Sequence, residues 1–142
     1  MDWFANGGPR EGREASRPCA GETARRDVPT CAATDRRGDV ARRVRDAGWP
    51  LAVVLDGERV VLGLLDALDG DPAAAVEDVM RAAPTTIRPH VTLEKAAQSL
   101  KTRRHDRVLV TTSDGRLIGL LWRADAERRL AQSTAPAQTA SR

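Results

Sequence analysis

The residue types that most often carry catalysis or bind metals are scarce in this 142-residue chain. Its histidines are His90 and His105, and its cysteines are Cys19 and Cys31. Neither histidine can be placed in a Ser/His/Asp or Cys/His arrangement, and the cysteines are not at metal-ligand spacing. The sequence also has no glycine-rich phosphate loop of the Walker or dinucleotide type. We therefore expect a protein that is not an enzyme and that holds no metal and no resident cofactor.

Basic side chains gather at one place in the second half of the chain, at Lys101, Arg103, Arg104 and Arg107. Cations at the C-terminal end of a helix are favoured by the helix dipole, so such a cluster is often only a solvated helix end. Contact with a phosphate group is the alternative. The formal net charge is only +3, with acids interspersed throughout, and we expect no nucleic-acid partner.

The rest of the composition is typical of a globular protein, with 41% hydrophobic and 30% charged residues. The apolar runs are the length of strands and far shorter than the roughly 20 residues of a membrane-spanning helix. The N-terminus has no secretory signal pattern, and two cysteines make no disulfide framework, which together predict a cytoplasmic protein. Residues 1–26 and 132–142 are poor in aliphatic side chains, and we expect both to be disordered tails.

The folded part between these tails contains an internal repeat. Gly63-Leu64-Leu65 recurs as Gly119-Leu120-Leu121, a shift of 56 residues. The same shift superposes Asp69 on Asp125, and it holds without a gap from Thr30 to Asp69. A chance match would not keep one register over about forty residues. The sequence therefore predicts two structural repeats, over 27–75 and 76–131.

Each repeat has the pattern of a β-α-β-β-α unit. In the second, 86–87 is a short extended segment, and Thr92 is a predicted N-cap. The next apolar residues have helical spacing, and strands over 107–111 and 117–121 flank the Ser113-Asp114-Gly115 turn. A closing helix is predicted over 124–130. The inward-facing helix residues are Leu93, Ala96, Ala97 and Leu100 in the second repeat, and Val40, Ala41, Val44 and Ala47 in the first.

The first repeat repeats this order with strands over 51–55 and 60–65. Its closing helix is weaker, because Asp69-Gly70-Asp71-Pro72 interrupts it. One repeat alone would have a small sheet with only one covered face, so the two repeats are expected to pack together. The predicted fold class is α/β (α+β).

Three segments of the second repeat resemble the CBS family. Residues 76–80 resemble the leading segment of a CBS repeat, Thr86-Ile87-Arg88-Pro89 resembles its first strand, and residues 114–119 resemble its hairpin. The resemblance implies a tandem CBS pair, a Bateman-type module, with two β-α-β-β-α repeats packed around a pseudo-twofold axis and two clefts. In the first repeat nothing near 20–24 matches the leading segment, and Ala33 stands where the second repeat has Pro89.

The resemblance also implies a site for an adenosine-containing ligand. The family signature ends each return strand with a glycine, a Ser or Thr three residues later, and an Asp that binds the ribose. The Asp is present as Asp69 and Asp125, but Asp66 and Trp122 replace the hydroxyl. Because a carboxylate at Asp66 would repel phosphate, the second cleft is the expected site. The predicted contacts are Thr86, Ile87, His105, Arg107, Trp122, Arg123 and Asp125 in the second cleft, and Thr30, Cys31 and Asp69 in the first.

Structural roles remain open for several of these residues. Asp125 could cap its helix, Asp69 could belong to an ordinary loop, and Trp122 could serve packing. The expected function is a regulatory module that senses AMP, ADP, ATP or S-adenosylmethionine and acts on a partner in trans, as a homodimer. The alternative is a degenerate module for dimerisation or protein interaction, with no nucleotide.

Overall fold

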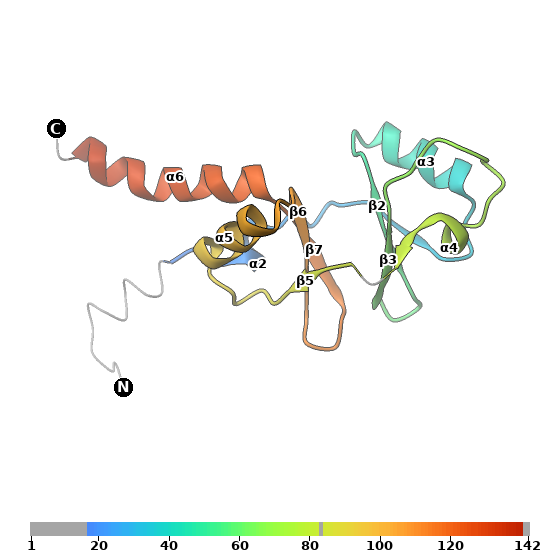
Figure 1. The fold of residues 1–142 in the computed structure, drawn as a ribbon, viewed down its shortest axis with the longest axis horizontal. Helices are drawn as coiled ribbons and strands as arrows, with labels where there is room; N and C mark the ends of the chain where they lie inside the picture. The colour runs from blue at the N-terminus through green and yellow to red at the C-terminus, as the bar shows by residue number, and fades with distance from the viewer. Residues whose placement is uncertain (1–16, 83, 141–142) are drawn as a thin grey trace.

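The structure is a computed structural model that describes residues 17–82 and 84–140, with side chains up to residue 132. It has two halves arranged side by side along the long axis of the molecule (Figure 1). We call residues that are 56 positions apart equivalent. In chain order the elements are α2 (Ala20–Thr23), β1 (Thr30–Ala32), α3 (Arg37–Asp46), β2 (Ala52–Leu55), β3 (Val61–Leu65), α4 (Val76–Val79), β4 (Arg81–Ala82), β5 (Thr86–Ile87), α5 (Leu93–Arg103), β6 (Arg107–Thr111), β7 (Leu117–Trp122) and α6 (Arg123–Ala140).

The two sheets confirm the predicted repeat. One sheet has the order β1-β2-β3-β4 and the other β5-β6-β7. In both, the first strand is parallel to the second and the hairpin that follows is antiparallel. Val54 pairs with Gly63 and Val110 with Gly119, and both hairpins have an irregularity just after that pair. The sequence shift of 56 residues therefore also holds for the strand register.

The central helix of each repeat buries the face that the apolar spacing predicts. Thr92 caps α5, because its Oγ1 accepts a hydrogen bond from the Lys95 amide at 3.3 Å. The helix ends at Arg104, which has a left-handed conformation with φ 59°. All the predicted inward residues of α5 and α3 are buried except Ala47, which is exposed because it lies at the C-cap of α3.

A shared core joins the two repeats. It consists of strand and linker residues from both sheets, namely Val28, Leu51, Val53, Leu55, Leu64, Leu109, Leu117 and Leu120. Val60 and Arg116, which are equivalent residues, form a β-bridge with each other. Equivalent residues meet in this way where a pseudo-twofold axis passes between them. The predicted architecture of two repeats around such an axis is therefore confirmed.

The segment that leads into each repeat packs on the other repeat. The amide of Ala20 in α2 donates to Val91 O at 2.8 Å, and Arg25 N donates to Leu120 O at 2.7 Å. In the same way, Val76 N in α4 donates to Asp35 O at 2.8 Å. Figure 1 shows α2 beside α5 and α6, at the far end of the molecule from α3. The boundary between 75 and 76 thus divides the sequence repeats, but it does not divide the packed halves.

The packing of α2 on the second repeat shows that the predicted disordered N-terminal tail is too long. We expected residues 1–26 to be disordered, but Ala20 and Ala24 are buried in the core of the second repeat. Few apolar residues suffice here because small alanines fill a surface that the second repeat already provides. Residues 1–16 lie outside the described part of the chain.

Gly63 and Gly119 allow these leading segments to approach closely. A Cβ atom at Gly119 would lie 2.7 Å from the carbonyl oxygen of Arg25, and one at Gly63 would lie 2.7 Å from that of Arg81. Both distances are well below van der Waals contact, so only glycine fits at either position. The recurring glycine in the sequence repeat is explained by this backbone contact.

The ends of the two repeats differ from each other and from expectation. No helix follows β3 before α4, so the weak closing helix predicted for the first repeat is absent from the described chain. Gly70 has φ +134° and Pro72 cannot donate an amide hydrogen bond, and both disfavour a helix. By contrast, α6 continues through Ala140, into residues we expected to be a disordered tail from 132 to 142. Residues 141–142 are outside the described part.

Candidate ligand cleft between the repeats

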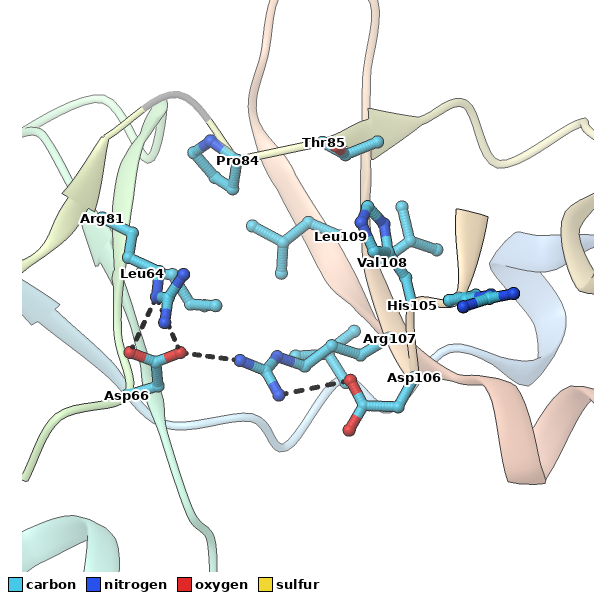
Figure 2. Close-up of a pocket in the computed structure, with 12 residues that line it drawn as sticks. Leu64, Asp66, Arg81, Pro84, Thr85, His105, Asp106, Arg107, Val108 and Leu109 are labelled. Atoms are coloured by element: carbon cyan, nitrogen blue, oxygen red, sulfur yellow. Dashed lines mark hydrogen bonds and ion pairs between the residues drawn. The ribbon is translucent and has the colours of Figure 1, made fainter. Parts of the chain in front are cut away.

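An open cleft of about 330 Å³ lies between the two repeats (Figure 2). One wall comes from the end of β3 and the segment around β4, and the other comes from the end of α5 and from β6. Its lining residues are Leu64, Asp66, Arg81, Pro84, Thr85, Arg104, His105, Asp106, Arg107, Val108, Leu109 and Leu120. The cleft therefore depends on how the repeats are placed relative to each other.

Apolar side chains from three strands form the inner part of this cleft. Leu64 is on β3, Leu109 is on β6 and Leu120 is on β7. All three belong to the core that joins the repeats, and each is buried. Such a surface suits a flat apolar group, while the charged side chains lie toward the opening of the cleft.

Asp66 is held between two arginines in the cleft. Its carboxylate accepts from Arg107 Nη2 at 2.8 Å and lies 3.1 Å from Arg81 Nε (Figure 2). The three residues meet because Asp66 directly follows β3, where Leu64 pairs with Arg81 of β4. The side chain of Asp66 is 20% exposed and that of Arg107 is 25% exposed, whereas Arg81 is 76% exposed. The carboxylate is therefore partly shielded from water and neutralised by its neighbours.

Arg104 and His105 complete the opposite wall. Arg104 follows α5 in the left-handed conformation, and the structure gives its side chain no ion pair or hydrogen bond among the described residues. The backbone amide of His105 donates to Leu100 O at 2.9 Å, which fixes this corner. His105 also lines an adjoining hollow of about 110 Å³ that contains Thr85, Thr86, Ile87 and Arg103.

The equivalent place on the other side of the pseudo-twofold axis is filled by two indole rings. Trp49 and Trp122 are stacked with their ring centroids 6.1 Å apart and an interplanar angle of 29°. Trp49 is equivalent to His105, and Trp122 is equivalent to Asp66. Both rings pack against the core that joins the repeats. In this structure Trp122 therefore packs against Trp49.

Asp125 lies on this filled side and is already engaged. Its side chain is 10% exposed and accepts hydrogen bonds from Arg25 Nε and Arg128 Nη2, both at 3.0 Å. The hydrogen bond and the charge of Asp125 both raise the pKa of the Arg25 guanidinium. Arg123 is paired with Glu127 at 2.8 Å along α6. Neither Asp125 nor Arg123 lines the open cleft.

The residues predicted in the first repeat are also placed away from the open cleft. Asp69 is 99% exposed and forms an ion pair with Arg45 at 2.6 Å, over α3. Thr30 and Cys31 belong to β1, where they pair with Val53 and Val54 of β2. Cys31 is buried, and this burial raises the pKa of its thiol to about 11.

Four of the predicted ligand contacts line the open cleft or the hollow beside it, and the others do not. His105 and Arg107 line the open cleft, and Thr86 and Ile87 line the adjoining hollow. Trp122, Arg123, Asp125, Asp69, Thr30 and Cys31 are not part of either. Sequence reasoning missed the contributions of Arg81, Leu64 and Leu109, because it built each cleft from one repeat. It also missed the two arginine partners, Arg81 and Arg107, that offset the charge of Asp66.

Comparison with known proteins identifies the class. Residues 76–125 match the CBS domain family model. The structure is similar to that of CBSX2, a CBS-pair protein from Arabidopsis thaliana, with a TM-score of 0.71 and 21% identity over 84% of this chain and 99% of that chain. No curated protein sequence matches significantly. Residues 76–125 thus match a CBS domain, and the described chain has the fold of a CBS pair.

Two further structures of this fold were determined with nucleotides. CBSX2 in complex with AMP gives a TM-score of 0.72 and 21% identity, over 82% of this chain and 98% of that chain. The cytosolic domain of the Mg²⁺ channel MgtE in complex with ATP gives a TM-score of 0.71 and 20% identity, over 85% of this chain and 54% of that chain.

Two other features of the described residues bear on function. None of the helices within 17–82 and 84–140 is long and apolar enough to cross a membrane. In the same residues, no three His, Cys, Asp or Glu side chains are grouped so that they could hold a metal ion.

Proposed function

We propose that this chain is a non-catalytic regulatory CBS pair that binds an adenosine-containing ligand in the open cleft between its repeats. The observation that carries the proposal is the asymmetry of the two clefts. One is open and combines an apolar inner surface with arginines, while tryptophans fill its counterpart. The AMP and ATP complexes of proteins with the same fold support this choice of ligand.

In this proposal the apolar and basic parts of the cleft bind different parts of the ligand. The adenine ring would lie against Leu64 and Leu109, which line the apolar inner part of the cleft. Arg104, whose guanidinium is unpaired in the described structure, would donate charge-assisted hydrogen bonds to an anionic group. Thr85 adds a hydroxyl and backbone groups at the edge of the cleft.

Regulation would follow from the position of the cleft. A ligand there contacts β3 of one repeat and β6 of the other, so its affinity depends on how the repeats are arranged. A ligand that binds one arrangement better shifts the population toward it. We propose that a partner protein in the cytoplasm reads this change in trans.

Calorimetric titration of the full chain with AMP, ADP, ATP and S-adenosylmethionine tests the proposal. At least one ligand should bind, and Arg104→Ala should weaken binding of an anionic ligand about ten-fold, as loss of one charge-assisted hydrogen bond implies. Arg42→Ala is the matched control, because Arg42 is 72% exposed on α3 and far from the cleft. No heat with any ligand at millimolar concentration would reject the proposal.

The second candidate is a CBS pair that dimerises or binds a protein and takes no nucleotide. The engagement of both signature aspartates favours it, since Asp125 is bound by Arg25 and Asp69 by Arg45. In either case we propose a homodimer. Light scattering should give twice the 15.4 kDa of one chain, and a monomer mass at all concentrations would contradict it.

A further inference from the structure

The carboxylate of Asp66 is the central charged group of the open cleft. It bridges Arg81, in β4 of the leading segment of the second repeat, and Arg107, at the start of β6 (Figure 2). Arg107 is also 3.4 Å from Asp106, so its guanidinium faces two carboxylates. These contacts use Nε of Arg81 and both terminal nitrogens of Arg107, so carboxylates already engage part of each guanidinium group that would otherwise bind a phosphate.

The cleft therefore has little positive charge available for a ligand. Its lining contains three arginines and two aspartates, which leaves one formal positive charge when His105 is neutral. Of the three guanidinium groups, only that of Arg104 has no ion pair or hydrogen bond in the described chain. One cation can balance a single anionic group, but it cannot balance a chain of phosphates.

We propose that Asp66 is the specificity-determining residue of the cleft and that it selects against polyphosphates. The preferred ligand has an adenosyl group and a tail of low net charge, as in adenosine and S-adenosylmethionine, whereas ATP is disfavoured. The adenosyl part of this inference rests on the proposed function, but the selection by charge does not.

The physical reason is that a polyphosphate must meet the Asp66 carboxylate or displace it. If Asp66 keeps its ion pairs, the phosphates lie close to a carboxylate whose side chain is only 20% exposed, where screening by water and salt is weaker than at the open surface. If Arg81 and Arg107 turn to the phosphates instead, Asp66 loses both partners while it stays largely buried. Either route lowers the affinity for polyphosphate.

Inorganic triphosphate tests this selection without any adenosyl group. Titrated into the full-length protein, it should bind the variant Asp66→Asn at least about ten-fold more tightly than the wild type, because the variant removes one charge and releases two arginines. The matched control is Asp106→Asn, which removes the other carboxylate of the cleft. Asp106 is 75% exposed, so this change should raise the affinity less than about three-fold.

The wild-type protein provides a second measurement that needs no variant. ATP should bind at least about ten-fold more weakly than S-adenosylmethionine, and Asp66→Asn should remove most of that difference. Equal affinity of wild type and Asp66→Asn for triphosphate, or an equal increase in Asp106→Asn, would overturn the inference. Tighter binding of ATP than of S-adenosylmethionine to the wild type would also overturn it.

The outcomes separate this inference from the proposed function. If adenosyl compounds bind but Asp66→Asn changes neither triphosphate nor ATP affinity, the function stands and the inference is wrong. If no adenosyl compound binds while Asp66→Asn still gains triphosphate affinity, the selection by charge stands and the proposed function is wrong.

Discussion

The two clefts are formed by equivalent backbone positions, but their side chains are polar in one cleft and apolar in the other. Where one has His105, Asp66 and Arg107, the other has Trp49, Trp122 and Leu51. The polar set leaves an open, charged cleft, and the apolar set closes its counterpart with stacked rings and a fully buried leucine. Internal symmetry therefore provides two places for a ligand, and a few side chains decide which of them remains open.

The arginines of the two leading segments show the same divergence. Arg25 and Arg81 are equivalent, and each follows a short helix that packs on the opposite repeat. Arg25 binds Asp125 on the filled side, whereas Arg81 binds Asp66 in the open cleft. Equivalent arginines thus stabilise the closed cleft through Asp125 and shape the open cleft through Asp66.

The largest loss of stability should come from a substitution that opens the closed cleft. Trp49→Ala removes half of the indole stack and the contacts of Trp49 with two core clusters. We expect it to lower the free energy of unfolding by about 3 kcal/mol, near the lower end for buried aromatics because Trp49 is only partly buried. His105→Ala, at the equivalent position, should change it by less than about 0.5 kcal/mol because His105 is exposed. Urea denaturation of both variants measures the difference, and equal losses would contradict the comparison.

A smaller difference in stability should separate substitutions of the two signature aspartates, Asp125 and Asp69. Asp125→Ala removes a mostly buried carboxylate with two arginine partners, and we expect a loss of about 1.5 kcal/mol in stability. This value is at the low end because both arginines are well exposed. Asp69→Ala removes an exposed ion pair and should cost less than about 0.5 kcal/mol.

The same two variants also test which cleft binds the ligand. Neither aspartate lines the open cleft, so the affinity for an adenosyl ligand should be unchanged in both. Folded Asp125→Ala protein that no longer binds the ligand would show that the filled side opens to receive it. That result would reverse the assignment of the two clefts.

The smallest expected effect concerns the reactivity of the Cys31 thiol and leaves the fold intact. Cys31 is packed in the same core cluster as Trp49, and burial raises the pKa of its thiol to about 11. Because the reactive form is the thiolate, alkylation at pH 8 should be slow and should accelerate up to about pH 11. In an exposed thiol this rise would end near pH 8.5.

Trp49→Ala should expose Cys31 and increase its alkylation rate at pH 8 about ten-fold or more. The measurement uses mass spectrometry in a Cys19→Ser background, where serine suits the N-cap position of α2. If the rate is the same with and without Trp49, the indole stack does not shield the closed side.

Much of the fold could be predicted from the sequence, and part of the site could be too. The 56-residue shift, the hairpin turns and the buried face of α5 follow from local patterns, because the forces that set them act within a few residues or within one repeat. His105 and Arg107 were expected as ligand contacts and line the open cleft, whereas the expected tails were too long because α2 and α6 extend into them.

The sequence by itself determined that there are two repeats and which strands and helices each contains, since periodicity and turn chemistry are local. Only the tertiary structure decided that each leading segment packs on the other repeat, and which of the two clefts is filled. The contacts responsible join Arg25 to Asp125, Asp66 to Arg107 and Trp49 to Trp122. Each of these pairs is tens of residues apart in the chain, and packing about the pseudo-twofold axis brings its members together.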